Sequence, residues 1–147
     1  MTKVNFNNLI LELIVSDIKI SLKFYCKVLG FHVEYERPED GFAFISYNGS
    51  QLMLEQDRYG ISPWRVAPLK QPYGRGLNIS INCPDVAALA NTLVLCGYSL
   101  RKPPETFWYR ESKELLGERN FLVQDPDGYL LRFAQAFGSK PITHDEL

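Results

Sequence analysis

Apolar and polar residues follow one pattern that occurs twice along the chain. The first copy opens with a short apolar run over residues 9–15, which is typical of a buried strand. Asp17 then provides a helix N-cap, and the apolar residues after it recur on one helical stripe that ends at Gly30. Glycine favours the end of a helix because it adopts a positive φ without steric cost. The first copy therefore begins as a strand followed by a helix.

Three further strands are predicted after this helix. Asn48-Gly49, between the last two of them, is a strong hairpin signal. The predicted strands cover residues 31–37, 42–47 and 51–56. The first copy thus has the order strand, helix, strand, strand, strand.

The second copy repeats this order. Apolar and polar residues alternate strictly over residues 77–81, and Cys83-Pro84-Asp85 leads into a second helix that ends at Gly97. Three more strands are predicted at residues 98–101, 120–124 and 129–136. The turn Asp125-Pro126-Asp127-Gly128 joins the last two strands. The pattern therefore predicts two βαβββ modules in tandem.

Two longer segments interrupt the pattern and are predicted to be loop-like. One is rich in proline and glycine and joins the modules, and the other is an insertion at residues 103–118 within the second module. Loops of this length are uncommon unless they have a function. The expected organisation is one domain over residues 1–147, with module one (about 9–56), a linker (57–76), module two (about 77–136) and a C-terminal tail (137–147).

The composition fits one domain with a small partner. The 147 residues, of which 46% are hydrophobic, suffice for one full-sized core. A formal net charge of -1 gives no general attraction for nucleic acid or an anionic membrane. No apolar segment approaches the roughly 20 residues that span a bilayer. Cys26, Cys83 and Cys96 are odd in number and lack CxxC spacing, so we expect reduced thiols and a cytoplasmic protein.

Two such modules in tandem resemble the vicinal oxygen chelate superfamily of glyoxalases, extradiol dioxygenases and bleomycin-resistance proteins. The matching motifs are Val15-Ser16-Asp17, Phe24-Tyr25, Val28-Leu29-Gly30-Phe31 and Asp125-Pro126-Asp127-Gly128-Tyr129. The resemblance covers about residues 9–136. It implies an α+β fold in which tandem βαβββ modules form a curved mixed-sheet cup, usually completed by a second subunit. A homodimer is therefore expected.

The resemblance also implies where a metal would bind. Enzymes of the family hold a divalent metal with His and Glu side chains at four strand positions, which fall here on Ile10, Glu55, Leu77 and Arg132. Isoleucine and leucine have no lone pair to donate, and arginine keeps a positive charge. One of the four inherited ligands survives, so we expect no bound metal and no cofactor.

Other candidate chemistry is sparse. His32 directly follows a helix-ending segment and His144 lies in the polar tail, so both are expected to be surface or structural residues. No G-x-S-x-G elbow or glycine-rich phosphate loop is present. A lyase or dioxygenase remains an alternative, but it requires metal ligands from unusual positions, such as Glu55 with Glu12 or His32.

Loss of the metal with retention of the fold resembles the bleomycin-resistance branch, which binds an antibiotic without altering it. The closing segment 127–135 is similar to that branch, including Arg132 at the former ligand position. One departure counts against bleomycin itself. The tryptophan that often precedes a glycine upstream of the Asp-Pro-x-Gly turn is Leu116 here, although Trp108 is a candidate substitute.

Aromatic side chains are the expected walls of the ligand site, because planar rings stack on them. Trp64 and Trp108 lie in the loop-like segments, and Phe44 lies on a strand, where a place in the core explains it equally well. Glu55 and Arg132 are expected at the floor of the cup. Two interpretations stay open for them, a pair that orients a polar ligand or a strand-end salt bridge.

Three classes of function follow. The first is a metal-independent small-molecule binding protein of the bleomycin-resistance type, with its cavity at a dimer interface. The second is the lyase or dioxygenase, and the third is a structural or regulatory interaction module. Metal analysis separates the second from the others, and a ligand-induced melting shift separates the first from the third.

Overall fold

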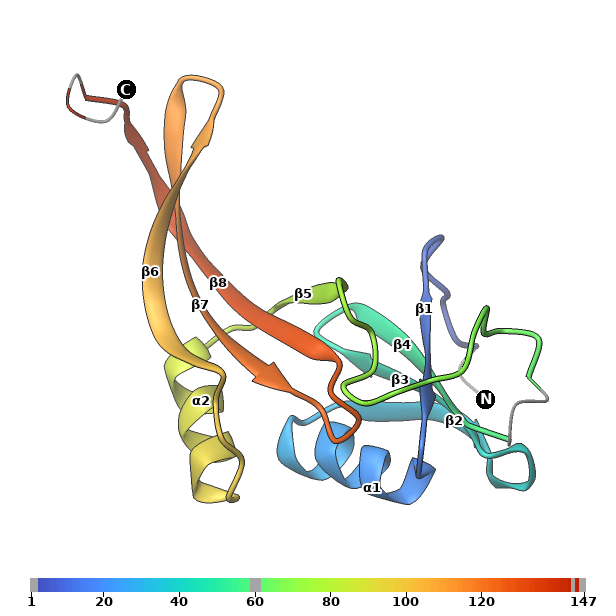
Figure 1. The fold of residues 1–147 in the computed structure, drawn as a ribbon. Helices are drawn as coiled ribbons and strands as arrows, with labels where there is room; N and C mark the ends of the chain where they lie inside the picture. The colour runs from blue at the N-terminus through green and yellow to red at the C-terminus, as the bar shows by residue number, and fades with distance from the viewer. Residues whose placement is uncertain (1–2, 59–61, 144, 146–147) are drawn as a thin grey trace. The chain divides into compact units, whose positions relative to one another are not determined.

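The computed structural model describes residues 3–58, 62–143 and 145, and the chain divides into two compact units (Figure 1). Unit one comprises residues 1–76 together with 125–129, and unit two comprises residues 77–124 and 130–147. Each unit holds one four-stranded mixed sheet. The predicted α+β class with tandem βαβββ modules is confirmed.

Unit one follows the predicted order closely. Asp17 caps the first helix by accepting hydrogen bonds from the backbone N–H groups of Lys19 and Ile20, and Gly30 follows the helical segment with a φ of 89°. The sheet has the order β1-β4-β3-β2, with β1 parallel to β4. Its elements are β1 (Leu11–Val15), α1 (Ile18–Leu22), the π-helical η1 (Lys23–Val28), β2 (His32–Arg37), the 3-10 helix η2 (Pro38–Asp40), β3 (Phe42–Tyr47) and β4 (Ser50–Gln56).

Strand register divides the side chains of unit one between two faces, because successive residues of a strand point in opposite directions. One face carries the apolar core with the helix residues Phe24 and Tyr25, both fully buried. The other face, here called the helix-free face, carries the alternate residues. They are Glu12 and Ile14 on β1, Met53 and Glu55 on β4, Phe42 and Phe44 on β3, and Tyr35 and Arg37 on β2.

Unit two has the same construction. Asp85 caps α2 by accepting a hydrogen bond from Ala88, and Gly97 follows with a φ of 90°. The sheet has the order β5-β8-β7-β6, with β5 parallel to β8. Its elements are β5 (Asn78–Asn82), α2 (Val86–Leu95), β6 (Lys102–Glu111), β7 (Glu114–Gln124) and β8 (Leu130–Pro141).

Three predicted boundaries in unit two are wrong. Residues 98–101 form no strand, and the insertion 103–118 is a β-hairpin rather than a loop, turning at Ser112 with a φ of 55°. The predicted tail is strand as far as Pro141, since β8 pairs with β7 out to Glu114. The aromatic run Phe107-Trp108-Tyr109 favours a strand, and pairing on both sides of β7 overrides the prolines and charges around it.

β6, β7 and β8 continue past α2 and β5 as a long twisted ribbon (Figure 1). We call residues 106–118 and 135–141 the arm. Its exposed aromatic residues include Trp108 and Phe137, which meet edge to face with ring centroids 5.2 Å apart. The arm is thus built on strand pairing and carries large apolar side chains in solvent.

The connection from β7 to β8, residues 125–129, belongs to unit one and is held there by buried carboxylates. Asp127, 1% exposed, accepts hydrogen bonds from the backbone N–H of Ser16 at 3.0 Å and the side-chain amide of Gln71 at 3.2 Å. The Tyr25 hydroxyl donates to Asp125 at 2.7 Å. The Tyr129 hydroxyl donates to the Ile14 carbonyl at 2.9 Å. This segment therefore fixes the end of β1 next to the first helix.

Two further observations concern the cysteines and the helices. The three cysteines are free, with Cys83 buried, Cys26 half-buried and Cys96 exposed. No helix within the described residues combines the length and apolar character that a bilayer crossing requires.

Candidate ligand-binding site

A cavity of about 390 Å³ lies on the helix-free face of unit one. β1 contributes Glu12 and Ile14 to its lining, β4 contributes Met53, and the linker after β4 contributes Trp64. Parallel pairing places Glu12 opposite Met53 and Ile14 opposite Glu55. Trp64 is 70% exposed, so its indole presents an open wall beside a largely apolar floor. Its volume and its mostly apolar lining with few polar groups are typical of a small-molecule site.

Glu12 and Glu55 form a carboxyl pair on this face. Burial raises the pKa of Glu12, and the charge of Glu55 and a hydrogen bond with Glu55 raise it further. The charge of Arg37 lowers the pKa of Glu12, as the smallest of the four causes. The Oε2 atom of Glu55 is buried and finds no hydrogen-bond partner among the described residues. The two carboxyl groups therefore concentrate negative charge on this face, and Glu55 Oε2 remains without a hydrogen-bond donor among the described residues.

Arg37 is the cation that acts on this pair, and it is itself engaged. Its guanidinium forms an ion pair with Asp40 at 3.2 Å, and it lies over the Phe42 ring at 4.1 Å from the centroid. Asp40 also pairs with Arg58 at 3.6 Å. Arg37 thus shares its charge with Asp40 and offsets only part of the negative charge of the two glutamates.

Phe44 is fully buried within unit one. Its ring stacks on Tyr35 at 5.4 Å with an interplanar angle of 10°, and Phe6 meets it edge to face at 5.1 Å. Its neighbours Phe6 and Tyr35 account for this burial on the helix-free face, as a structural role predicts. A contact between Phe44 and a ligand stays a prediction.

Trp108 lies on a strand and not in the loop that we predicted. It pairs with Gly117 across β6 and β7, and the Lys140 ammonium lies 4.2 Å from the centre of its ring. A Cβ atom at Gly117 would lie 2.4 Å from Phe137 and 2.9 Å from Trp108, so glycine provides the room for this cluster. Trp108 is 41% exposed, and its role as a ligand wall stays a prediction.

Arg132 lies on β8 in unit two, opposite Leu122 and Ser80. Its Nε atom is buried and has no hydrogen-bond partner among the described residues. Glu55 belongs to unit one, so the expected pairing between Glu55 and Arg132 also stays a prediction.

The donors at the inherited metal positions do not fit a divalent metal. Glu55 carries the one carboxylate, whereas Ile10, Leu77 and Arg132 provide no donor atom suited to a cation. His32 is exposed at the start of β2, and His144 lies outside the described residues. Within the part of the chain that the structure describes, no group of three or more His, Cys, Asp or Glu side chains converges.

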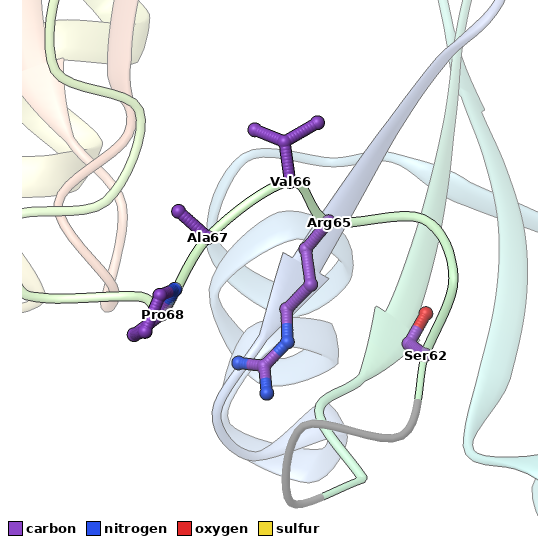
Figure 2. A pocket seen from close by; sticks show the side chains of 5 residues that line it. All are labelled: Ser62, Arg65, Val66, Ala67 and Pro68. Atoms are coloured by element: carbon purple, nitrogen blue, oxygen red, sulfur yellow. The ribbon is translucent and has the colours of Figure 1, made fainter.

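A second hollow, of about 250 Å³, lies in the linker (Figure 2). Arg65, one of its lining residues, pairs with Asp57 at 3.3 Å, and Asp57 Oδ1 is buried without a described partner. Figure 2 shows the Arg65 and Val66 side chains pointing to opposite sides of the linker. The lining residues are Ser62, Arg65, Val66, Ala67 and Pro68. Because the guanidinium is already paired, this hollow offers less free charge than the cavity beside Trp64.

The chain belongs to the Glyoxalase/Bleomycin resistance protein/Dioxygenase superfamily, whose family model matches residues 8–133. The resemblance inferred from the motifs is confirmed at this level. No curated protein matches the chain.

Solved structures from Salmonella typhimurium and Micromonospora sp. ML1 show the same fold. A virulence protein from Salmonella typhimurium is 18% identical with a TM-score of 0.68, over 92% of this chain and 100% of that chain. TioX from Micromonospora sp. ML1 is also 18% identical, with a TM-score of 0.67 over 90% of this chain and 100% of that chain. A superfamily member from Vibrio splendidus 12B01 is 33% identical over 86% of this chain and 95% of that chain, with a TM-score of 0.41.

Proposed function

We propose that this protein is a metal-independent small-molecule binding protein of the bleomycin-resistance type, which sequesters an antibiotic or another planar ligand in the cytoplasm. The observation that carries the proposal is the cavity beside Trp64. Its floor is formed by Ile14 and Met53, and its polar groups are few and charged. Such a lining binds a ring by burial and orients it by one polar contact.

Binding requires no chemical step in this proposal. A planar ring that enters the cavity loses apolar surface to Ile14 and Met53 and stacks on the exposed face of Trp64. Stacking on an indole contributes on the order of 1 kcal/mol beyond the burial of area. Glu55 and Arg132 are proposed to set the polarity of the floor, with Trp108 as a second wall.

Replacing Trp64 with alanine is expected to weaken the binding of a planar aromatic probe about tenfold and to leave the melting temperature nearly unchanged. The side chain is 70% exposed, so the folded state loses little on truncation. Isothermal titration calorimetry with 1-naphthalenemethanol measures the affinity, and calorimetric melting measures stability.

Trp108→Ala provides the parallel variant. If Trp108 is a wall of the ligand site, Trp108→Ala should also weaken binding about tenfold and leave the melting temperature nearly unchanged. If Trp108→Ala instead lowers the melting temperature strongly and leaves the affinity unchanged, the edge contact of Trp108 with Phe137 is structural and Trp108 is not a wall of the site.

The purified protein is expected to contain no stoichiometric zinc, nickel, manganese or iron, and chelators should not change its melting temperature. Three inherited ligand positions carry residues that cannot coordinate a divalent cation. Elemental analysis and melting with EDTA test this. A stoichiometric metal lost on Glu12→Gln or Glu55→Gln would favour the lyase or dioxygenase alternative, for which the approach of these two carboxyl groups is the supporting observation.

We also propose a homodimer, whose interface completes the cavity. Within the described residues each sheet ends on strands with one unpaired edge, β1 and β2 in unit one and β5 and β6 in unit two. Closed two-fold pairing is the commonest way to cover such edges. Light scattering at micromolar concentration should give twice the chain mass of 16.9 kDa, and a value near one chain mass would contradict the dimer.

A further inference from the structure

Beside the cavity of unit one lies a buried acceptor that lacks a donor, on Glu55 opposite the lining residue Ile14. Glu55 Oε2 is inaccessible to solvent and has no hydrogen-bond partner among the described residues. A buried carboxylate oxygen without a donor is costly, so such an atom indicates a missing group. Glu12, which interacts with Glu55, lines the cavity beside Trp64 and Met53. A donor that enters the cavity therefore meets this carboxyl pair at Glu12.

The charge around this acceptor is negative. Arg37 on β2 faces the pair and is bound to Asp40 on η2 at 3.2 Å, while β3 contributes the uncharged Phe42 opposite Glu55. In the linker, Arg65 is paired with Asp57 at 3.3 Å. The nearby cations therefore have carboxylates of their own, and the Glu12–Glu55 pair has an excess of negative charge.

We propose that this cavity selects planar ligands that carry a protonated amine or amidine, whose N–H groups donate to Glu55 and Glu12 while the ring stacks on Trp64. The inference rests on the proposed function and specifies the ligand class of the same site. Charge-assisted hydrogen bonds are about twice as strong as neutral ones, so an ammonium group gains more here than a hydroxyl. The indole face adds a second attraction for a cation.

Alternative occupants satisfy the site less well. A quaternary ammonium brings charge but has no N–H for Glu55 Oε2. A divalent metal requires more ligands than two carboxylates, and no third His, Cys, Asp or Glu joins them in the described chain. An anionic ligand would face Glu12 and Glu55 directly.

The test compares four probes that share one ring. They are 1-naphthylmethylammonium, its trimethylammonium analogue, 1-naphthalenemethanol and 1-naphthoate, titrated calorimetrically at pH 7. We expect the primary ammonium to bind at least tenfold more tightly than the alcohol, the quaternary cation to lie between them, and the carboxylate to bind most weakly. Glu12→Gln and Glu55→Gln should each remove most of the preference for ammonium, with affinity for the alcohol within about twofold of the native value.

Glu36→Gln is the matched control. It removes the same charge from the same sheet, but Glu36 is exposed on β2 and pairs with Ala43, which places it on the opposite face. This variant should leave all four affinities unchanged. An equal loss of ammonium binding in Glu36→Gln would mean general electrostatic attraction and would overturn the assignment. Melting curves of each variant confirm folding.

The outcomes separate the two proposals. If the alcohol binds as tightly as the ammonium, the cation site is wrong and the small-molecule binding function stands. Equal affinity for the primary and quaternary cations overturns the hydrogen-bonded assignment. Absence of binding by all four probes at millimolar concentration counts against the proposed function itself, and the ligand class fails with it.

Discussion

Asp127→Ala is expected to lower the free energy of unfolding by about 3 kcal/mol or more. The side chain is 1% exposed and accepts hydrogen bonds from the backbone N–H and hydroxyl of Ser16 and from Gln71. Alanine removes all three hydrogen bonds, and a hydrogen bond to a charged group contributes about 1.5–3 kcal/mol. Urea denaturation monitored by circular dichroism measures the change.

Asp40→Ala is the control for this prediction. Asp40 pairs with Arg37 and Arg58 at the surface, and all three side chains are about half exposed. Exposed ion pairs contribute roughly 0–1 kcal/mol, so this variant should remain close to the native stability. A loss below about 1 kcal/mol in Asp127→Ala would show that water replaces the carboxylate at little cost.

Local signals predicted the first half of the fold well. Asp17 and Gly30 delimit the first helical segment as expected, because capping and positive φ depend on the residue itself. Asn48 and Gly49 both adopt positive φ in the predicted hairpin turn. Helix caps and turns of this kind can be predicted from neighbouring residues alone.

The arm could not be predicted in the same way, because its stability depends on pairing between distant segments. Pro103 and Pro104 indicate a loop when read locally, yet β6 accommodates them where its register with β7 shifts. The close approach of Trp108 and Phe137 above Gly117 requires the register of three strands. The sequence alone contains no local signal for that register.

The site was partly predictable. Loop placement indicated Trp64, which does line the cavity, whereas a ligand contact of Glu55, named from its motif position, stays a prediction. Glu12 was considered as an unusual metal ligand, although its alternation with Ile14 on β1 already indicated a common face with the cavity. The buried role of Asp125 and Asp127 was missed, because the same four residues also fit an exposed turn.

The stability of the protein is expected to fall as the pH rises from about 4 to 7, through Asp125. Burial raises the pKa of Asp125 from 3.8 to about 6, although hydrogen bonds from Tyr25, Tyr129 and Asp127 oppose the shift. The folded state therefore binds the proton more tightly than the unfolded state does. The stabilisation is complete below the unfolded value and is lost as the pH passes the folded value. The difference between these two pKa values corresponds to a loss of about 3 kcal/mol at neutral pH.

Asp125→Asn isolates this contribution from other titrating groups, including Glu12, whose raised pKa acts in the same direction. Asparagine resembles the protonated acid and keeps an oxygen that can accept from the N–H groups of Asp127 and Tyr129. Tyr25 stays neutral over this range, because burial and then the charge of Asp125 hold its pKa well above 10. Between pH 4 and pH 7 the unfolding free energy of the variant should therefore rise by about 2 kcal/mol relative to that of the native protein, because part of the loss has already occurred at pH 4. Urea titrations at several pH values measure both proteins. Parallel stability curves would mean that Asp125 is already ionised in the folded state at pH 4, with Tyr25 and the backbone N–H groups sufficient to hold its charge.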